Sequence, residues 1–251
     1  MATADTSQPE GPKRTLVSLC TYNERENIEL LIPRILAAAP DVEIVVVDDN
    51  SPDGTGAYAD TLAAENPRIH VMHRPQKLGL GKATLAALAY AIEQGYEYWL
   101  NMDADFSHSP EKVPELIACM QHADVAIGSR YVAGGGVEGW HWRRHVMSRC
   151  INTYARLLLG LKTRDNSGAF RCYNLAKLRD LDLNRFRATG YAIQEELLYR
   201  CRQVGCTFTE SPIIFADRQL GESKINQKEA VLAVWVLFCL AIDRLLGVPV
   251  K

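Results

Sequence analysis

The sequence predicts an α/β fold in which a mostly parallel sheet is flanked by helices. Three observations support this fold class. Short apolar runs alternate with longer amphipathic segments through the first half of the chain. The run at 43–47 (EIVVV) is apolar on both faces, as a strand in the middle of a parallel sheet is. Each run is followed by enough chain for one helix, which is the pattern of right-handed strand–helix–strand units.

Residues 14–128 are expected to hold these units in order. In the segment 27–39, Ile28, Leu31, Ile32 and Ile35 recur at helical spacing and predict a helix with one buried face. The expected strands are 15–20, 43–47, 69–73, 98–102 and 125–128, and the expected helices are 27–39, 55–64, 81–94 and 110–121. This half resembles a Rossmann-like arrangement and is interpreted as the nucleotide-binding half.

The pattern changes after residue 128. A glycine-rich loop at 134–139 leads into a basic, aromatic segment at 140–149, and a helix is expected at 194–203, a strand at 212–216 and a polar loop at 217–226. The final apolar segment, 231–242, ends at Asp243 and Arg244 and is shorter than the roughly 20 residues that a bilayer span needs. We therefore expect a buried or membrane-lying helix there. Residues 14–251 are predicted to form one domain, with 129–251 as its acceptor-binding half, after a disordered tail at 1–13.

Composition excludes some functions. The chain has 251 residues, of which 47% are apolar, which is enough for a hydrophobic core. A net charge of -2 argues against nucleic-acid binding, which usually requires a basic domain. The seven cysteines form no C-x-x-C pair and the N-terminus has no apolar signal segment, so a reducing, cytoplasmic location is expected.

Acidic residues follow two of the expected central strands. Asp48 and Asp49 come after the strand at 43–47, and Asp103 and Asp105 come after the strand at 98–102. Ligands of parallel sheets bind beyond the carboxyl ends of the strands, where these two clusters would meet. Mg²⁺ and Mn²⁺ prefer oxygen ligands and commonly bridge carboxylates to substrate phosphates. The pattern therefore predicts a metal and diphosphate site, whereas a second D-x-D pair at 180–182 lacks a preceding strand and is assigned to a turn.

Two segments resemble phosphate-binding motifs of other protein classes. The segment 78–82 (LGLGK) looks like a Walker A loop, but Gln76 and Ala83 stand where that motif requires Gly and Ser or Thr. The segment 54–59 (GTGAYA) matches a loose dinucleotide pattern and would indicate an NAD(P)-dependent oxidoreductase. The three aspartates of the preceding turn would repel a pyrophosphate, and His73 and Arg74 follow the next strand where an acid is expected.

The second half concentrates cations on a predicted acceptor side. The segment 140–149 contains three arginines and two tryptophans and no acid, and Arg130, Arg218 and Lys224 lie at expected strand ends or loops. The guanidinium group of arginine can bind two phosphate oxygens at once, and Trp together with Arg is typical of a lipid headgroup interface. A phosphate monoester is anionic near neutral pH, so such an acceptor needs positioning and charge screening more than a general base.

These motifs, taken in order, resemble the dolichol-phosphate mannosyltransferases, which are inverting glycosyltransferases of GT-A fold. The resemblance runs from about residue 16 to about residue 235. It rests on TYNEREN at 21–27, DDNSPDGT at 48–55, DADFSH at 103–108, GSRY at 128–131, the W-x-x-x-R-x-x-x-S-R segment at 140–149 and DRQLGESK at 217–224. Cys20 departs from the proline that relatives usually carry in the first donor loop.

The resemblance implies roles for individual residues. Asp103 and Asp105 match the metal and diphosphate ligands, with Ser107 as a third metal position. Arg130 and Arg218 join the two aspartates as the expected catalytic residues. The implied donor-binding residues are Thr21, Tyr22, Glu24, Asp49, Asp103, Ala104 and Asp105, and the implied acceptor-phosphate residues are Arg130, Arg144, Ser148, Arg218 and Lys224. Gln194 and Glu196 match a family segment beside the active site.

The resemblance also implies the reaction and the partners. It implies mannose transfer from GDP-mannose to a polyprenyl (dolichyl) phosphate at the cytoplasmic membrane face, with Mg²⁺ or Mn²⁺ as cofactor. The chain resembles the short class, which lacks a transmembrane tail, so a membrane surface built from 231–242 with Trp140 and Trp142, or a membrane-anchoring subunit, is expected. The nearest alternative is a polyprenyl-phosphate glucosyltransferase that uses UDP-glucose; a nucleotide-sugar pyrophosphorylase and a non-catalytic binding module are the alternatives from other classes.

Overall fold

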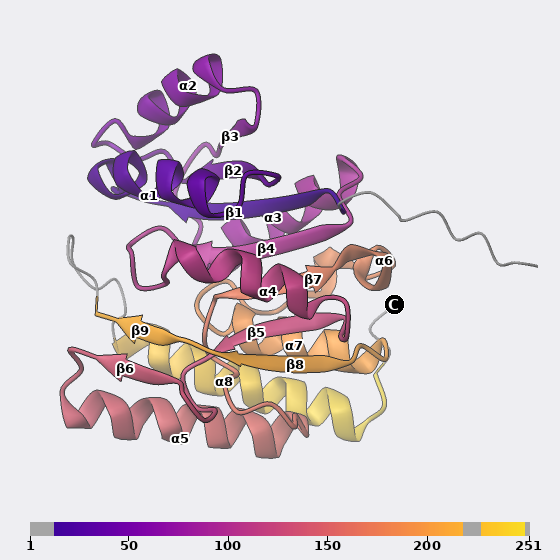
Figure 1. The fold of residues 1–251 in the computed structure, drawn as a ribbon. Helices are drawn as coiled ribbons and strands as arrows, with labels where there is room; N and C mark the ends of the chain where they lie inside the picture. The colour runs from indigo at the N-terminus through magenta and orange to yellow at the C-terminus, as the bar shows by residue number, and fades with distance from the viewer. Residues whose placement is uncertain (1–12, 218–226, 249–251) are drawn as a thin grey trace, which may run out of the picture.

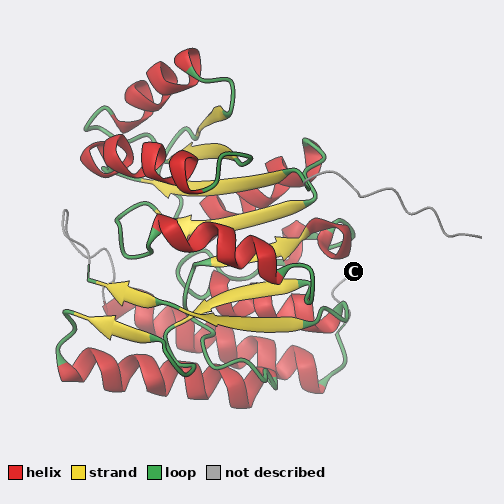
Figure 2. Cartoon of the chain, viewed as in Figure 1, coloured by secondary structure: helices red, strands yellow, loops and turns green. Residues whose placement is uncertain are grey.

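The computed structural model describes residues 13–217 and 227–248, so most of the expected tail at 1–13 and most of the loop at 217–226 lie outside the described residues. Helices cover both faces of one large sheet, and a small two-stranded sheet lies beside it (Figures 1 and 2). The expected α/β fold with a mostly parallel sheet is confirmed.

The described helices and strands follow the predicted order through the first half. They are β1 (Thr15–Thr21), α1 (Arg25–Ala38), β2 (Glu43–Asp48), α2 (Thr55–Glu65), β3 (Ile69–His73), α3 (Leu80–Glu93), β4 (Tyr98–Asp103), the 3₁₀ turn η1 (Pro110–Lys112), α4 (Val113–Cys119) and β5 (Val125–Ser129). Each predicted strand and helix of this half is present, with boundaries within two residues except at the start of the predicted helix 110–121. That helix begins as the turn η1 and ends at Cys119, before Met120.

The second half adds shorter elements around the same sheet. They are β6 (Gly136–Glu138), α5 (Trp142–Leu159), β7 (Arg171–Asn174), α6 (Leu175–Leu178), η2 (Leu183–Arg185), α7 (Ile193–Gln203), β8 (Phe208–Pro212), β9 (Ile214–Ala216) and α8 (Gln227–Leu245). The large sheet has the order β3-β2-β1-β4-β7-β5-β8, and β6 pairs with β9. Strands from both halves of the chain therefore share one sheet.

Two strands of the large sheet, β7 and β8, were missed by the sequence analysis. β7 is antiparallel to both of its neighbours, and Arg171 faces Asn101 of β4 and Ile127 of β5. A short strand that begins with a charged residue gives no apolar run to detect. The strand expected at 212–216 is also corrected: β8 ends at Pro212, Ile213 intervenes, and β9 pairs with β6 in the small sheet.

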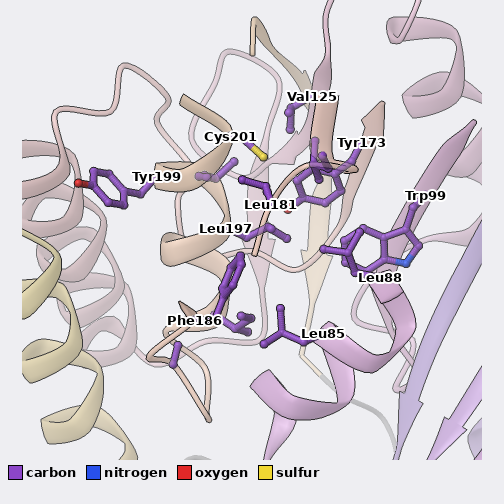
Figure 3. Packing of buried hydrophobic residues seen from close by; sticks show 14 of the residues in the cluster. Leu85, Leu88, Trp99, Val125, Tyr173, Leu181, Phe186, Leu197, Tyr199 and Cys201 are labelled. Atoms are coloured by element: carbon purple, nitrogen blue, oxygen red, sulfur yellow. The ribbon is translucent and has the colours of Figure 1, made fainter. Parts of the chain in front are cut away.

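Two hydrophobic clusters fill the space between the sheet and its helices. The cluster beneath α3 and α7 includes Trp99 and Tyr173, whose rings stack with centroids 5.1 Å apart (Figure 3). The second cluster lies beneath α1 and α4, and Leu100 and Cys172 belong to it because successive strand residues face opposite sides of the sheet. Both faces are buried, which explains why the central strands are apolar throughout.

The last two long helices form an outer layer on the α7 side. α5 and α8 run side by side below the sheet in Figure 1, and α5 contributes Leu159 while α8 contributes Leu237 and Leu240 to the first cluster. The apolar segment 231–242 is thus part of a longer helix with one buried face. Within the described ranges, no helix has both the length and the apolar character to cross a bilayer.

Candidate active site

A cavity of about 270 Å³ lies at the carboxyl ends of β1, β2 and β4. All seven expected donor-binding residues line it: Thr21, Tyr22, Glu24, Asp49, Asp103, Ala104 and Asp105. The loops after three neighbouring parallel strands meet at this edge of the sheet, so residues up to 84 positions apart in the sequence share one wall. The structure therefore gathers the expected donor residues in one place.

Hydrogen bonds fix the acidic loops of this cavity. Asp48 accepts from the Thr21 hydroxyl at 3.0 Å and from the Ser51 backbone at 3.0 Å. Asp49 is paired with Arg74, and although burial raises the pKa of the Asp49 carboxyl above its usual value, the Arg74 charge opposes that rise. Asp48 and Asp49 thus brace the loop, while Asp103 and Asp105 supply carboxylates beside them.

The DADFSH loop has an unusual backbone. Phe106 has a φ of 60°, a left-handed conformation that is rare for a bulky side chain. Asp105 accepts from the Ser107 backbone N–H at 3.1 Å, and the Asp103 backbone N–H donates to His108 Nδ1 at 3.2 Å. Strained backbone of this kind occurs preferentially at functional sites. Here it turns the chain sharply so that Asp103 and Asp105 both reach the cavity.

His108 supports this loop from below. Its ring is 1% exposed and stacks on Phe170 with centroids 5.1 Å apart. Burial lowers the pKa of His108 to about 4, with Asp105 acting in the opposite direction. A neutral imidazole therefore accepts the Asp103 N–H bond at physiological pH.

The carboxylates fit a divalent cation by their chemistry. Mg²⁺ and Mn²⁺ take oxygen donors and are commonly held by one or two carboxylates together with substrate phosphates, which Asp103 and Asp105 can satisfy. Among the described residues there is no group of three or more His, Cys, Asp or Glu side chains placed to hold a metal ion. Ser107 differs from the expectation: it is 2% exposed and lines a separate pocket with Phe106 and Ala216.

A positive side of the cavity was missed by the sequence analysis. Lys77, Gly79 and Leu80 line it, and Leu80 begins the 14-residue helix α3. A helix N-terminus directs unpaired N–H groups and a partial positive charge at an anion. The segment 78–82 was set aside because it fails as a Walker A loop, yet a glycine-rich stretch directly before a helix was the signal for this wall.

The expected acceptor residues that the structure describes, Arg130, Arg144 and Ser148, lie elsewhere in the fold. Arg130 is 7% exposed and its Nε and Nη2 donate to Asp165 at 2.7 and 2.6 Å. Burial alone would raise the pKa of Asp165, but the Arg130 guanidinium holds it below its usual value. Arg130 is thus charge-compensated in the interior and does not line the donor cavity.

Arg144 and Ser148 lie near Arg130 around an aromatic cluster. The Arg144 guanidinium lies 4.2 Å from the Trp140 ring centroid and 2.7 Å from Asp217, and the Ser148 hydroxyl lies 2.7 Å from that of Tyr131. The structure therefore brings these residues together, apart from the donor cavity. Arg218 and Lys224, the other two expected acceptor residues, lie outside the described residues.

A buried polar group at the start of α7 gives a testable pH effect. Glu195 is 3% exposed, its Oε2 has no hydrogen-bond partner, and burial raises its pKa to about 7. The folded protein therefore holds this proton up to about pH 7, whereas the unfolded chain releases it near the ordinary glutamate value. This contribution to stability is present at low pH and is lost as pH rises toward the folded pKa.

Replacing Glu195 with Gln should remove this pH dependence. Because the amide never ionises, we expect the variant's free energy of unfolding to gain about 2 kcal/mol relative to wild type between pH 5 and pH 8. Urea denaturation of both proteins across this pH range measures the difference. A constant difference between the two proteins would show that Glu195 ionises as an ordinary carboxyl.

The chain is similar in sequence to known glycosyltransferases. Residues 17–182 match the glycosyl transferase family 2 profile. The chain is 47% identical over 227 residues to a polyprenol monophosphomannose synthase of Mycolicibacterium smegmatis, covering 88% of this chain and 86% of the relative. It is 42% identical over 213 residues to an undecaprenyl-phosphate mannosyltransferase of Micrococcus luteus, covering 85% and 88%.

Solved structures share the fold at low sequence identity. A glucosyl-3-phosphoglycerate synthase from Mycobacterium tuberculosis, in complex with Mn²⁺, UDP and glucosyl-3-phosphoglycerate, superposes with a TM-score of 0.64 at 18% identity, covering 94% of this chain and 81% of that chain. A mannosyltransferase from Pyrobaculum calidifontis in complex with GDP-Man and Mn²⁺ gives 0.54 at 14% identity, covering 96% and 76%. These likenesses show the fold.

Proposed function

Since this chain belongs to glycosyl transferase family 2, we propose that it transfers mannose from GDP-mannose to a polyprenyl phosphate, with inversion at the anomeric carbon. The observation that carries the proposal is the single cavity in which all seven expected donor residues meet. The two relatives above, at 47% and 42% identity, are named for polyprenol monophosphomannose synthesis and undecaprenyl-phosphate mannosyl transfer.

Different residues of the cavity are proposed to bind the nucleoside, the diphosphate and the metal ion of the donor. Tyr22 and Glu24 would contact the nucleoside, while Lys77 and the partial positive charge at the start of α3 would stabilise the diphosphate. Asp103 and Asp105 would hold Mg²⁺ or Mn²⁺, which when bound supplies charge stabilisation to the departing diphosphate. The anomeric C–O bond to GDP breaks as a bond to the acceptor phosphate oxygen forms, and GDP leaves with the bonding electron pair.

The acceptor side would be contributed by residues 129–251. Arg130, held in place by Asp165, and Arg144 are the expected phosphate-binding arginines among the described residues. Arg218, Lys224 and Ser148 complete the proposed phosphate-binding set. An anionic phosphate acceptor needs no proton removed from it, so positioning is the main task of these residues.

Product formation tests the proposal. Purified protein with Mg²⁺ or Mn²⁺, a polyprenyl phosphate and labelled GDP-mannose should carry label into the organic phase. A parallel reaction with labelled UDP-glucose tests the alternative donor. Label from UDP-glucose alone would change the donor, and label from neither would remove the proposed acceptor.

We also propose that the protein lies at the cytoplasmic membrane surface through α8. Its exposed apolar stripe, spaced at helical intervals, is Val231, Trp235, Phe238, Ile242 and Leu245. Trp142 of the neighbouring α5 is 62% exposed and lies beside Arg143, as suits a headgroup interface. Trp140 departs from the expectation, since it packs against Phe215 with ring centroids 5.4 Å apart.

Charges placed on this stripe should weaken membrane binding. Phe238 and Leu245 are 45% and 85% exposed, and replacing both with Glu should reduce partitioning to anionic liposomes by about tenfold or more. Leu30→Glu is the matched control, because Leu30 is 57% exposed on α1. Co-sedimentation measures the partitioning, and equal loss in the control or no loss in the double variant would refute this docking face.

A further inference from the structure

A second cavity lies against α8, beside the donor cavity. Its volume is about 230 Å³, and it is enclosed by the loop 187–192 on one side and by α8 on the other. Ala188, Leu232, Ala233 and Val236 give it mainly apolar walls. The Arg187 side chain at its edge is charge-compensated, because it donates to the Asp243 carboxylate at 3.0 and 3.1 Å.

This groove adjoins the donor cavity. Gly190, Tyr191 and Glu229 line both. A Cβ on Gly190 would lie 2.0 Å from Glu229 Oε2, so the loop and the Glu229 side chain of α8 are in close contact at this junction. The two spaces are therefore next to each other, with these three residues at their junction.

The wall opposite α8 is held in place by α3. The Gly81 N–H donates to the Thr189 carbonyl at 2.8 Å, and a Cβ on Gly81 would lie 2.5 Å from the Ala188 carbonyl oxygen. The groove wall and the start of α3, which faces the donor cavity, are therefore fixed relative to each other. The far side is more open, since Leu232 and Trp235 are 52% and 61% exposed beside the apolar stripe of α8.

We infer that this groove binds the first isoprene units of the acceptor lipid, which rests on the function proposed above. A prenyl phosphate has a phosphate head that must reach the donor sugar and an apolar chain that must leave the site. The groove lies next to the donor cavity, has mainly apolar walls and opens beside the apolar stripe of α8. An apolar cavity of about 150 Å³ holds a six-carbon ring, so 230 Å³ has room for about one or two five-carbon isoprene units.

The inference predicts a dependence on chain length even without a membrane. Each methylene group buried in an apolar site strengthens binding by about fourfold. Prenyl phosphates of one, two and three isoprene units remain dispersed in buffer at low concentration and can be compared directly. We expect kcat/KM to rise by about tenfold or more from the first unit to the second, and then to level off as the chain leaves the groove.

Two groove variants and one matched control test this. Leu232→Glu places a carboxylate in the groove at a half-exposed position, and Ala233→Trp fills the groove by volume. Val234→Glu is the control, because Val234 is 40% exposed on the same helix and does not line the groove. Circular dichroism checks folding, and each protein is assayed for transfer and for prenyl phosphate binding by calorimetry.

The possible results distinguish a failure of the groove inference from a failure of the proposed mannosyl transfer. We expect both groove variants to lose the gain from the second isoprene unit, and Val234→Glu to keep it. If wild type and both groove variants show the same dependence on chain length, the groove does not bind the isoprene units, while the proposed transfer activity stands. Chain-length-dependent binding that the groove variants abolish, without transfer in wild type, would support the groove and refute the function.

Discussion

Replacing Asp105 with Ala should lower kcat/KM for mannosyl transfer by about a thousandfold. Asp105 and Asp103 are the carboxylates of the cavity that can hold a divalent cation beside the diphosphate, and Asp105 is only 7% exposed. Losing one of two such ligands removes several kcal/mol of stabilisation from the departing group, which corresponds to a loss of this size. Steady-state assays with GDP-mannose and a prenyl phosphate measure it.

Asp180→Ala is the matched control for this change. Asp180 belongs to the other D-x-D pair of the chain, is exposed and does not line the donor cavity. It should keep kcat/KM within about twofold of wild type, as exposed positions away from the site usually do. In calorimetry, GDP-mannose binding should lose its dependence on Mn²⁺ in Asp105→Ala alone. An active Asp105→Ala protein would place the metal elsewhere.

The largest effect on stability is expected at the buried pair between Asp165 and Arg130. Asp165 accepts from the Arg130 backbone N–H at 2.9 Å, from two of its side-chain nitrogens, and from the Gly168 N–H at 3.1 Å. Asp165→Ala would leave the guanidinium buried without its carboxylate. Breaking such a pair from one side costs about 3–5 kcal/mol, and we expect the free energy of unfolding to fall by this amount.

An exposed ion pair provides the comparison for Asp165. Asp60 lies 2.8 Å from His73, with both side chains more than half exposed. Asp60→Ala should change the free energy of unfolding by less than about 1 kcal/mol, because solvent screens such pairs. Urea denaturation at neutral pH measures both variants. Equal, small losses would mean that Arg130 keeps its charge compensated without Asp165.

The sequence was most informative where one local pattern carries one structural role. An apolar strand followed directly by aspartates predicted both the sheet and the carboxylate edge, and Asp49, Asp103 and Asp105 do line one cavity. The meeting of these carboxylates was predictable because parallel strands bring their carboxyl ends to one edge.

The sequence was least informative where long-range packing decides the role of a residue. The partner of Arg130 could not be predicted, because Asp165 lies 35 positions away and belongs to no motif. Strand β7 was not predicted because the charged residue Arg171 interrupts the apolar pattern. In the folded protein, Arg171 is buried and its Nη1 and Nη2 donate to the Gln194 and Asp165 carbonyls. Tertiary contacts of this kind leave no periodic signal.

Phosphorus NMR of a complete reaction tests the central proposal most directly. Protein, divalent cation, GDP-mannose and a short prenyl phosphate are combined, and the phosphorus signals are followed to completion. We predict that the phosphate monoester converts to a phosphodiester while an equal amount of GDP appears, and that proton NMR assigns the β configuration to the new mannosyl phosphate. GDP released with free mannose and an unchanged monoester, or an α-linked product, would contradict the proposed transfer.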